Sequence, residues 1–290
     1  MRGKVCLVTG ATGGIGLEIA LGLARLGATT VMVGRDRARS EAALAGVKER
    51  SGSATVELLL ADLSSQRQVR QLAADFKARH DRLHVLVNIA GIVAGRRTLT
   101  EDGIERTFAV NHLAPFLLTT LLLEVLVASA PARVVTVSSD AHRAGRIDFM
   151  DLNCVRRYRG LRAYCDSKLA NVLFTYELAR RLAGTGVTAT CVHPGSVGTN
   201  WGLGVGGIFA FGYRLARRFM LTPEQGARPA LYAATAPALE GVTGRYFTQK
   251  GEVRSSPASY DQSLAERLWE VSARLTHSAG DAPAPAPVAA

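Results

Sequence analysis

The sequence predicts an α/β fold in which a doubly wound parallel sheet carries helices on both faces. Short apolar runs alternate with segments of helical periodicity along most of the chain, as successive βαβ units require. The apolar runs are rich in valine, isoleucine, leucine and threonine, which suits parallel strands covered on both faces. A glycine-rich turn joins the first run to the first helix.

The elements follow in a regular order. Strands are predicted at 4–10, 28–34, 54–63, 84–91, 133–139 and 187–195, and helices at 15–26, 66–79, 113–127 and 161–182. Gly27 and Gly184 close two of these helices, because glycine accepts the left-handed conformation that often ends a helix. A later helix begins at LTPEQ, where Thr222 caps it, Pro223 suits the first turn and Gln225 completes a capping box.

The chain is expected to form a single domain. At 290 residues, with 48% hydrophobic and 20% charged residues, it can bury one sizeable core. No internal repeat or linker divides it, so we expect one dinucleotide-binding catalytic domain over residues 1–278. Residues 279–290, which include the run APAPAPVAA, offer nothing to bury and are expected to be a disordered tail.

Composition limits the partners and the compartment. The net charge of +11 favours anionic partners such as a phosphorylated cofactor, a membrane surface or nucleic acid. The basic residues are spread without an aromatic-interleaved patch, so we expect a solvated surface and no nucleic-acid partner. The four cysteines lack metal-ligand spacing, which predicts no metal site and a reducing compartment. With no signal peptide and no apolar stretch of about 20 residues, we expect a soluble, cytoplasmic protein.

The turn VTGATGGIGLEIA predicts a dinucleotide site. Glycines here allow a tight turn and let backbone N–H groups approach a pyrophosphate at the positive end of the following helix. The position directly after a strand and before an amphipathic helix makes the motif more specific. The residues assigned to the cofactor in this turn are Gly10, Thr12, Gly13, Gly14, Ile15 and Gly16. These features together predict a single-domain Rossmann fold.

The end of the second strand, VMVGRDR, predicts which dinucleotide is bound. Arg35 takes the position from which a side chain reaches the adenosine ribose, and Gly34 leaves room beside it. A guanidinium forms charge-assisted hydrogen bonds with a 2′-phosphate, so NADP(H) is the predicted cofactor. Asp36 follows at once, and a carboxylate at that position would instead bind the ribose hydroxyls of NAD.

Two further strand ends complete the predicted cofactor site. Asp62 and Leu63 end the third strand, where Asp62 can reach the adenine. At the end of the fourth strand, Asn88 is expected to tie neighbouring strands. Ala90 and Gly91 follow it and let the cofactor lie against backbone.

The segment YCDSK places Tyr164 and Lys168 on one helix face, with Cβ atoms roughly 5–6 Å apart. An unperturbed tyrosine has a pKa near 10 and is a poor base at neutral pH, but a nearby ammonium favours the phenolate. Lowering this pKa by about 3 units needs roughly 4 kcal/mol. A tyrosine tuned in this way exchanges a proton with an alcohol or an alkoxide. Taken alone, the spacing favours a packed tyrosine beside an exposed lysine.

Two other polar residues turn this pair into a catalytic hypothesis. VVTVSS brings two hydroxyls to the carboxyl end of the fifth strand, where ligands bind in open α/β sheets. We assign Ser139 to the substrate oxygen and expect Ser138 to satisfy backbone groups. Asn111, in FAVNHLAPF, is an indifferent helix former. Its amide either organises a water beside Lys168 or makes a structural hydrogen bond inside a buried helix.

These motifs resemble those of the short-chain dehydrogenase/reductase family. TGATGGIG, NIAG, VNHLAPFLLT, VVTVSS, YCDSK and VHPGSV fall in the family's order and spacing, and the resemblance covers residues 4–275. It implies a catalytic tetrad of Asn111, Ser139, Tyr164 and Lys168, in which Tyr164 and Lys168 also contact the cofactor and the lysine binds the nicotinamide ribose. In HPGSVGT it implies that Pro194, Val197 and Thr199 flank the nicotinamide and hold its carboxamide.

A closer resemblance is to the retinol dehydrogenase-like branch, through VSSDAHRAGRIDFMDLN, YCDSKLANVLFTYELARRL and ERLWEVS. It implies a preference for NADP and a lipophilic aldehyde or ketone, such as a retinoid, as substrate. The family commonly forms dimers or tetramers, so a homo-oligomer is expected. The chain departs from the branch in two ways: we expect no N-terminal membrane anchor, which many members carry, and Gly13 replaces a hydroxyl or basic side chain of relatives. Because of the second departure, Arg35 is expected to provide more of the contacts to the 2′-phosphate.

The segment 200–222 is expected to be a substrate lid. NWGLGVGGIFAFGYRLARRFM is apolar and glycine-rich before it becomes basic. Its apolar half favours a lipophilic substrate, and its basic half suits a peripheral contact with an anionic bilayer. The alternative is an ordinary surface loop followed by a helix packed on the domain.

The leading hypothesis is therefore an NADP(H)-dependent oxidoreductase that interconverts a lipophilic aldehyde or ketone and its alcohol. A tailoring reductase of a cyclic ketone or tetrapyrrole-like substrate would use the same residues. A non-catalytic NADP-binding sensor would keep the fold. Such sensors commonly lose the tyrosine or the lysine, and this chain keeps both Tyr164 and Lys168.

Overall fold

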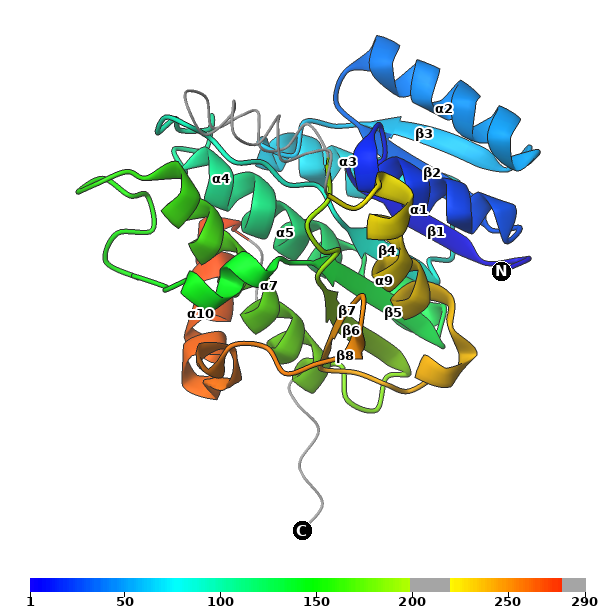
Figure 1. Ribbon diagram of the computed structural model, residues 1–290. Helices are drawn as coiled ribbons and strands as arrows, with labels where there is room; N and C mark the ends of the chain where they lie inside the picture. Colours follow the sequence, from blue (N-terminus) through cyan, green and yellow to red (C-terminus); the bar gives the residue numbers. More distant parts are fainter. Residues whose placement is uncertain (199–219, 278–290) are drawn as a thin grey trace.

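The computed structural model describes residues 1–198 and 220–277 of the chain. Its centre is an eight-stranded sheet with the order β3-β2-β1-β4-β5-β6-β7-β8. Neighbouring strands are parallel except β7 and β8, which are antiparallel. Helices lie on both faces of the sheet (Figure 1), so the predicted fold class is confirmed. The strand order reverses at β1, which places the ligand-binding edge of the sheet beside the end of that strand.

Strands and helices alternate along most of the chain. The strands are β1 (Val5–Val8), β2 (Thr29–Gly34), β3 (Val56–Leu60), β4 (Val85–Asn88), β5 (Ala132–Val137), β6 (Val187–Val192), β7 (Arg245–Thr248) and β8 (Gly251–Glu252). The longer helices are α1 (Gly14–Arg25), α2 (Arg37–Ser51), α3 (Gln66–Arg79), α5 (Ala114–Leu121), α6 (Leu123–Ala128), α7 (Gly160–Arg181), α9 (Pro223–Thr235) and α10 (Gln262–Leu275). Short helical turns are α4 (Arg106–Phe108), η1 (Ala109–Leu113), η2 (Asp140–Ala144), η5 (Pro237–Leu239) and η6 (Pro257–Tyr260). β1 to β6 coincide with the six predicted strands, and β7 and β8 are additional.

The core has two halves, one on each face of the sheet. Side chains along a strand point alternately to opposite faces, so Leu7 of β1 packs in one half while Cys6 and Val8 pack in the other. Helices α3, α5, α6 and α7 cover the Leu7 half, and α1, α2 and α9 cover the other. Helix α10 packs along α7 and adds Trp269 to the Leu7 half. This two-sided cover explains why the strands lack a polar face.

The segment predicted as one helix over 113–127 is broken in the structure. A π-helical turn, η1, leads into α5, and α5 and α6 are separated at Leu122 (φ −104°, ψ 3°). Pro115 accounts for the first irregularity, because it has no N–H to donate to the carbonyl of Asn111 and interrupts the regular hydrogen-bond ladder. The prediction of a continuous helix is therefore wrong here, and the irregular turn carries Asn111.

Other helix boundaries agree with their predictions within one residue. The predicted capping box at α9 is confirmed, since Gln225 N donates to Thr222 Oγ1 over 3.2 Å and Thr222 N donates to Gln225 Oε1 over 2.9 Å. Within the two described ranges, no helix combines the length and the apolarity needed to cross a bilayer.

A buried histidine makes the stability of this fold depend on pH. His112 on η1 is fully buried, and its Nε2 lies 2.9 Å from Ser272 Oγ of α10. Burial lowers the pKa of His112 to about 3, against an opposing contribution from Asn171. The unfolded chain therefore takes up a proton near pH 6.5 that the folded protein takes up only near pH 3. The stability that the protein has above pH 6.5 therefore falls as the pH is lowered. His112 alone should reduce the free energy of unfolding by about 2 kcal/mol between pH 7 and pH 5.

Urea unfolding of wild type and of His112→Gln at pH 7 and pH 5 measures this loss. Glutamine does not titrate, so the variant should lose about 2 kcal/mol less than wild type between the two pH values. The comparison isolates His112, because burial also lowers the pKa values of His84, His142 and His193 in both proteins. Equal losses in wild type and variant would contradict the prediction.

Candidate active site

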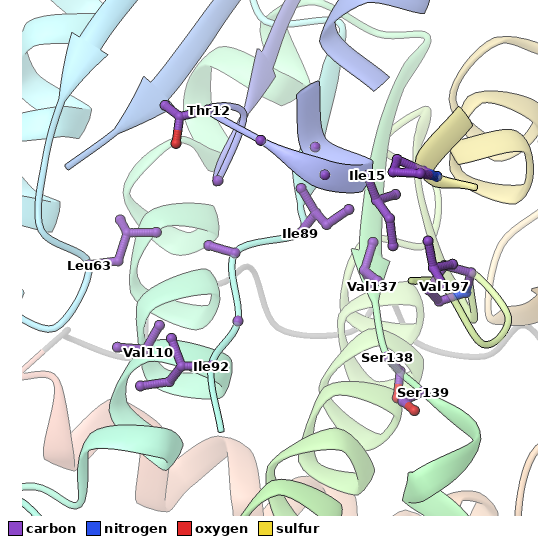
Figure 2. Close-up of a pocket in the computed structure, with 18 of the residues that line it drawn as sticks. Thr12, Ile15, Leu63, Ile89, Ile92, Val110, Val137, Ser138, Ser139 and Val197 are labelled. Carbon is purple, nitrogen blue, oxygen red and sulfur yellow. The ribbon is translucent and has the colours of Figure 1, made fainter. Parts of the chain in front are cut away.

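A cavity of about 900 Å³ lies at the carboxyl ends of the parallel strands, where ligands bind in doubly wound sheets (Figure 2). Most of the predicted cofactor residues line it: Gly10, Thr12, Gly13, Gly14, Ile15, Gly16, Arg35, Asp62, Leu63, Ala90, Gly91, Tyr164, Lys168, Pro194 and Val197. Ser139, from the predicted catalytic set, lines the same cavity. One space therefore joins the glycine-rich turn to the tyrosine and lysine of α7.

The glycine-rich turn packs too closely for larger residues at two positions. A Cβ placed on Gly16 would lie 2.3 Å from the carbonyl oxygen of Gly10, and one placed on Gly10 would lie 3.0 Å from Ala90 Cα. Gly10 also has a φ of 63°, in the left-handed region that favours glycine. Helix α1 therefore begins directly beside the end of β1, and Gly13 adds no side-chain cap. A helix N-terminus on a cavity wall suits a pyrophosphate.

Helix α7 brings Tyr164 and Lys168 together in the cavity, and both are almost fully buried, at 8% and 3% exposed. Lys168 Nζ lies 5.6 Å from the centre of the Tyr164 ring and donates to the carbonyl of Val137 over 3.0 Å. Burial lowers the pKa of Lys168 to about 8, with Cys191 acting in the opposite direction. At neutral pH the cavity thus holds a buried ammonium beside the Tyr164 ring.

Ser138 and Ser139 have different surroundings at the end of β5. Ser138 Oγ donates to the backbone carbonyl of Lys168 over 2.7 Å, so it satisfies backbone as predicted and fastens α7 to β5. Ser139 Oγ accepts a hydrogen bond from Ala141 N over 3.2 Å. Its side chain lies beside Ser138 at the cavity wall (Figure 2). Ser138 therefore donates to the backbone of α7, whereas Ser139 accepts from its own turn at the cavity wall.

Asn111 comes close to Lys168 but lies behind the cavity wall. Its Oδ1 accepts from Ile92 N over 2.8 Å, and its Nδ2 donates to Ile92 O over 2.9 Å and to Ser167 Oγ over 3.0 Å. A Cβ built on Gly91 would lie 3.4 Å from both Asn111 Oδ1 and Lys168 Nζ. The absence of a side chain at Gly91 therefore lets the amide and the ammonium approach each other, while the amide itself fixes the loop after β4.

The family model for short chain dehydrogenases matches residues 4–203. The chain belongs to the short-chain dehydrogenase family. It is 44% identical over 275 residues to human retinol dehydrogenase 12, across 95% of this chain and 87% of the relative. It is 43% identical over 279 residues to human retinol dehydrogenase 13, across 94% of this chain and 84% of the relative. The predicted family and its retinol dehydrogenase-like branch are confirmed, and the protein is an oxidoreductase acting on CH–OH and C=O groups.

Solved structures share the fold of this short-chain dehydrogenase. A crystal structure of an uncharacterized protein from Mycobacterium paratuberculosis matches with a TM-score of 0.77 and 36% identity, over 95% of this chain and 94% of that one. The Pseudomonas aeruginosa RhlG/NADP active-site complex matches with a TM-score of 0.65 and 26% identity, over 86% and 95% of the two chains. The architecture described above is thus common to relatives of limited sequence identity.

The structure adds Arg39 to the wall of the dehydrogenase cavity, which it lines together with Arg35. Arg35 Nη1 lies 3.8 Å from Asp62 Oδ2, whereas Arg39 Nη2 would lie 2.8 Å from a Cβ placed on Gly13. Asp36 caps α2 by accepting from Arg39 N over 2.9 Å. Arg39 is absent from the residues predicted from the sequence, because Arg35 lies before the start of α2 and no helix spacing relates the two arginines. The guanidinium of Arg39 occupies the space that a side chain at position 13 would fill.

Asn88 requires a correction, because it neither ties neighbouring strands nor lines the main cavity. Its Nδ2 donates instead to Thr119 Oγ1 of α5 over 3.0 Å. Thr9 makes the tie between strands, since its Oγ1 accepts from Ile89 N over 3.1 Å and from Ala90 N over 3.2 Å. The sequence signal for this tie is the hydroxyl of Thr9 directly after β1, because β1 and β4 are neighbours in the sheet.

Some predictions fall outside the described residues. Thr199, most of the predicted lid at 200–222 and the tail at 279–290 belong to this group, while Met220 from the end of the lid segment lines the cavity. In residues 1–198 and 220–277, no group of three or more histidine, cysteine or acidic side chains is arranged to hold a metal ion.

Proposed function

We propose that the protein is an NADP(H)-dependent oxidoreductase that interconverts a lipophilic aldehyde or ketone and its alcohol, with Tyr164 as general acid and base. The observation that carries this proposal is the buried Lys168 ammonium, 5.6 Å from the Tyr164 ring, in the cavity that also contains the glycine-rich turn. A group that binds at the turn and a proton donor on α7 therefore share one space.

The cavity residues fit a dinucleotide. Close packing at Gly10 and Gly16 lets the start of α1 approach a pyrophosphate, and Pro194 and Val197 give the wall after β6 an apolar surface. A bound nicotinamide dinucleotide supplies or accepts the hydride. The protein must then bind the substrate, exclude water and move one proton.

Tyr164 moves that proton in this proposal. During carbonyl reduction its hydroxyl donates to the substrate oxygen as negative charge develops there, and during alcohol oxidation the phenolate accepts the proton. Lys168 favours the phenolate by its charge, and the Val137 carbonyl holds the ammonium in place. Ser139 Oγ donates to the same substrate oxygen. Asn111 fixes the neighbouring loop and, as the motif implies, organises a water beside Lys168 for proton relay.

NADP(H) is proposed in preference to NAD(H) because two guanidiniums line the adenosine end of the cavity. Arg35 and Arg39 can both reach a 2′-phosphate there, and Asp36 is engaged as the cap of α2. The RhlG complex, a relative by structure, contains NADP. These observations support the preference that the VMVGRDR motif predicts.

Arg39→Ala should weaken NADPH binding about tenfold to hundredfold, because a hydrogen bond to a charged group contributes roughly 1.5–3 kcal/mol. NADH lacks the 2′-phosphate and should bind wild type and variant equally. Fluorescence titration gives both dissociation constants. Arg37→Ala is the matched control, since Arg37 lies on the same helix, pairs with Glu41 over 3.3 Å and does not line the cavity. A parallel loss of NADPH and NADH affinity would contradict the assignment.

A lipophilic substrate is proposed from the apolar side chains of Ile92, Val110 and Met220 in the cavity wall and from the names of the retinol dehydrogenase relatives. A screen of retinal, medium-chain aldehydes and cyclic ketones with NADPH or NADH tests the whole proposal. We expect NADPH oxidation with retinal or an aldehyde. Turnover restricted to cyclic ketones would favour the tailoring reductase, and NADPH binding without any turnover would favour the sensor.

We propose in addition a peripheral membrane contact through the segment between η2 and α7. Met150 and Val155 are 85% and 69% exposed there, beside the exposed Arg157 and Arg159. Apolar side chains among arginines suit an anionic bilayer surface. The protein should sediment with phosphatidylserine vesicles more than with phosphatidylcholine vesicles, and Met150→Ser combined with Val155→Ser should reduce this. Equal sedimentation with both vesicles would contradict the contact.

A homo-oligomer in the cytoplasm completes the proposal. The free thiols of Cys6, Cys154, Cys165 and Cys191 support a reducing compartment. Size-exclusion chromatography with light scattering tests the assembly, and a mass of one chain at micromolar concentration would contradict it.

A further inference from the structure

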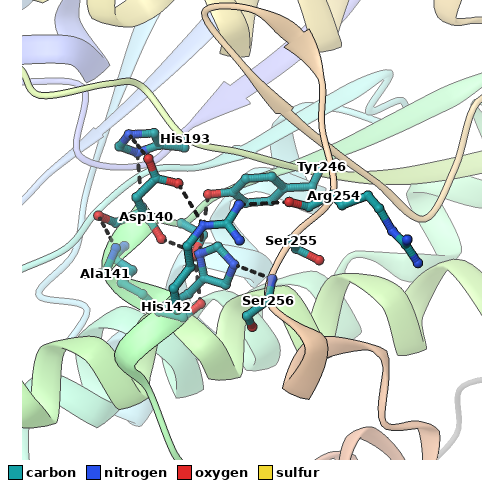
Figure 3. A network of polar contacts seen from close by, with 12 residues as sticks. Asp140, Ala141, His142, His193, Tyr246, Arg254, Ser255 and Ser256 are labelled. Carbon is teal, nitrogen blue, oxygen red and sulfur yellow. Dashed lines mark hydrogen bonds and ion pairs between the residues drawn. The ribbon is translucent and has the colours of Figure 1, made fainter.

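The turn after Ser139 contains a buried histidine that takes no direct part in the proposed reaction. His142 of η2 is fully buried, and its two ring nitrogens meet different parts of the chain. Nδ1 lies 2.6 Å from the backbone carbonyl oxygen of Ser139, and Nε2 lies 2.9 Å from the backbone nitrogen of Ser256 (Figure 3). Because a carbonyl only accepts and an amide N–H only donates, Nδ1 must carry the proton and Nε2 must accept. His142 is therefore a neutral imidazole with a fixed tautomer.

On one side, His142 restrains the peptide group that follows Ser139. The Ser139 carbonyl also accepts the backbone N–H of His142 over 3.0 Å, and Ser139 Oγ accepts from Ala141 N over 3.2 Å. Two donors on one carbonyl fix the plane of that peptide. This plane holds the backbone at the Ser139 Cα, and the hydrogen bond from Ala141 N to Oγ then fixes the direction of the side chain.

On the other side, the segment that contains Ser256, the partner of His142 Nε2, is anchored to helix α7. Ser255, next to Ser256, has its Oγ 2.7 Å from Tyr176 OH and 2.6 Å from Ser259 Oγ, and these serines are buried. Tyr176 lies on α7, about three turns after Tyr164. A chain of contacts thus runs from α7 through the segment 255–256 and His142 to Ser139.

The charged groups around η2 fasten the same turn from outside. Asp140 Oδ2 lies 3.2 Å from His193 Nε2, and Arg143 Nη2 donates to the Arg254 carbonyl over 2.8 Å (Figure 3). Tyr246 OH lies 3.5 Å from His142 Nδ1. In this buried setting the pKa of His142 is lowered, mainly by burial, which agrees with the neutral tautomer that the hydrogen bonds require.

We propose that His142 is a positioning residue that sets the orientation of Ser139 relative to Tyr164. This inference rests on the proposed function, because that function gives Ser139 its role at the substrate oxygen. His142 acts through the Ser139 carbonyl and through Ser256, without touching the reacting atoms. A displacement of about 1 Å at a catalytic group can lower a rate about hundredfold, so loss of this restraint should reach kcat.

Three substitutions separate the two hydrogen bonds of His142. Asparagine places an amide donor near the position of Nδ1 and can restore the bond to Ser139, whereas glutamine reaches toward Ser256. Phenylalanine fills the space and makes neither bond. We expect His142→Phe to lower kcat about tenfold to hundredfold, with the KM for NADPH within about twofold of wild type. His142→Asn should recover most of that loss and His142→Gln little of it, and the reverse order would overturn the proposal.

A double-substitution cycle with Ser139→Ala distinguishes positioning from a general structural role. If His142 acts through Ser139, adding His142→Phe to Ser139→Ala should change the single-turnover rate less than about twofold. The same fold-loss in both backgrounds would overturn the inference, and so would full activity of His142→Phe beside a slow Ser139→Ala. The cycle is repeated with His142→Gln, so that the test does not depend on the folding of one variant. An unchanged rate in Ser139→Ala itself would instead show that the proposed role of Ser139 is wrong.

Discussion

Tyr164→Phe is expected to lower kcat for carbonyl reduction about 10³-fold, because a positioned general acid contributes roughly 10²–10⁴-fold. Phenylalanine keeps the ring that packs beside Lys168 Nζ and removes only the hydroxyl. NADPH binding should therefore change by less than about twofold. Steady-state kinetics with a substrate found in the aldehyde screen gives kcat, and fluorescence titration gives the affinity for NADPH.

Tyr232→Phe is the matched control for this substitution. Tyr232 lies on α9, is 46% exposed and does not line the cavity, so loss of its hydroxyl should leave kcat unchanged. A Tyr164→Phe protein that keeps more than about a tenth of the wild-type kcat would remove the tyrosine from the proton transfer. The oxidoreductase family would stand in that case, but the proposed mechanism would not.

Lys168→Met is expected to abolish most activity and yet to stabilise the protein. Burial lowers the pKa of this lysine from 10.5 to about 8, so holding its charge at pH 7 costs about 3 kcal/mol of folding free energy. Methionine has a similar length and no charge, and it loses the hydrogen bond to Val137, about 1 kcal/mol, together with the contact of the ammonium with the Tyr164 ring. The free energy of unfolding should therefore rise by about 2 kcal/mol at pH 7. The kcat/KM for carbonyl reduction should fall about 10²-fold or more, since the phenolate of Tyr164 loses its cation.

The pH dependence of the stability difference tests the cause. Between pH 8 and 10.5 the unfolded wild-type chain still binds this proton while the folded protein has released it, so wild-type stability rises with pH. The advantage of Lys168→Met should accordingly shrink over that interval. Guanidinium unfolding at pH 7, 9 and 10.5 measures it, with Lys77→Met, at an exposed position on α3, as the control. A variant less stable than wild type at pH 7 would contradict the prediction, because it would show that the charged Lys168 stabilises the folded protein.

The fold could be predicted because its signals are local. Each strand from β1 to β6 is a short apolar run, Gly27 (φ 82°) follows the end of α1, and Thr222 caps the start of α9. The break at Leu122 and the π-helical turn before it escaped prediction, because the apolar pattern continues through them. The short pair of β7 and β8 also escaped, since four and two residues carry too little pattern to be recognised.

The site was predicted where its residues share a motif and missed where they meet only in three dimensions. Tyr164 and Lys168 are four residues apart on one helix, so their proximity follows from helix geometry. Arg39 reaches Gly13 only because α2 follows a strand that is paired with β1. The bond between His142 and Ser256 spans 114 positions of the chain, and no local pattern announces it. Asn88 shows the opposite error, a motif residue whose side chain faces a helix rather than the cofactor space.

In the π-helical turn 109–113, the number of residues matters for the position of Asn111 as much as their identity does. An α-helix advances about 100° per residue, so excising one residue between Asn111 and Pro115 would restore a regular spiral and swing the Asn111 amide by about that angle relative to α5. The Asn111 amide would then lose its hydrogen bonds with Ile92 and Ser167, although the asparagine and the residues before it would be unchanged. In this protein a single-codon deletion in that turn should be as harmful as losing the asparagine itself.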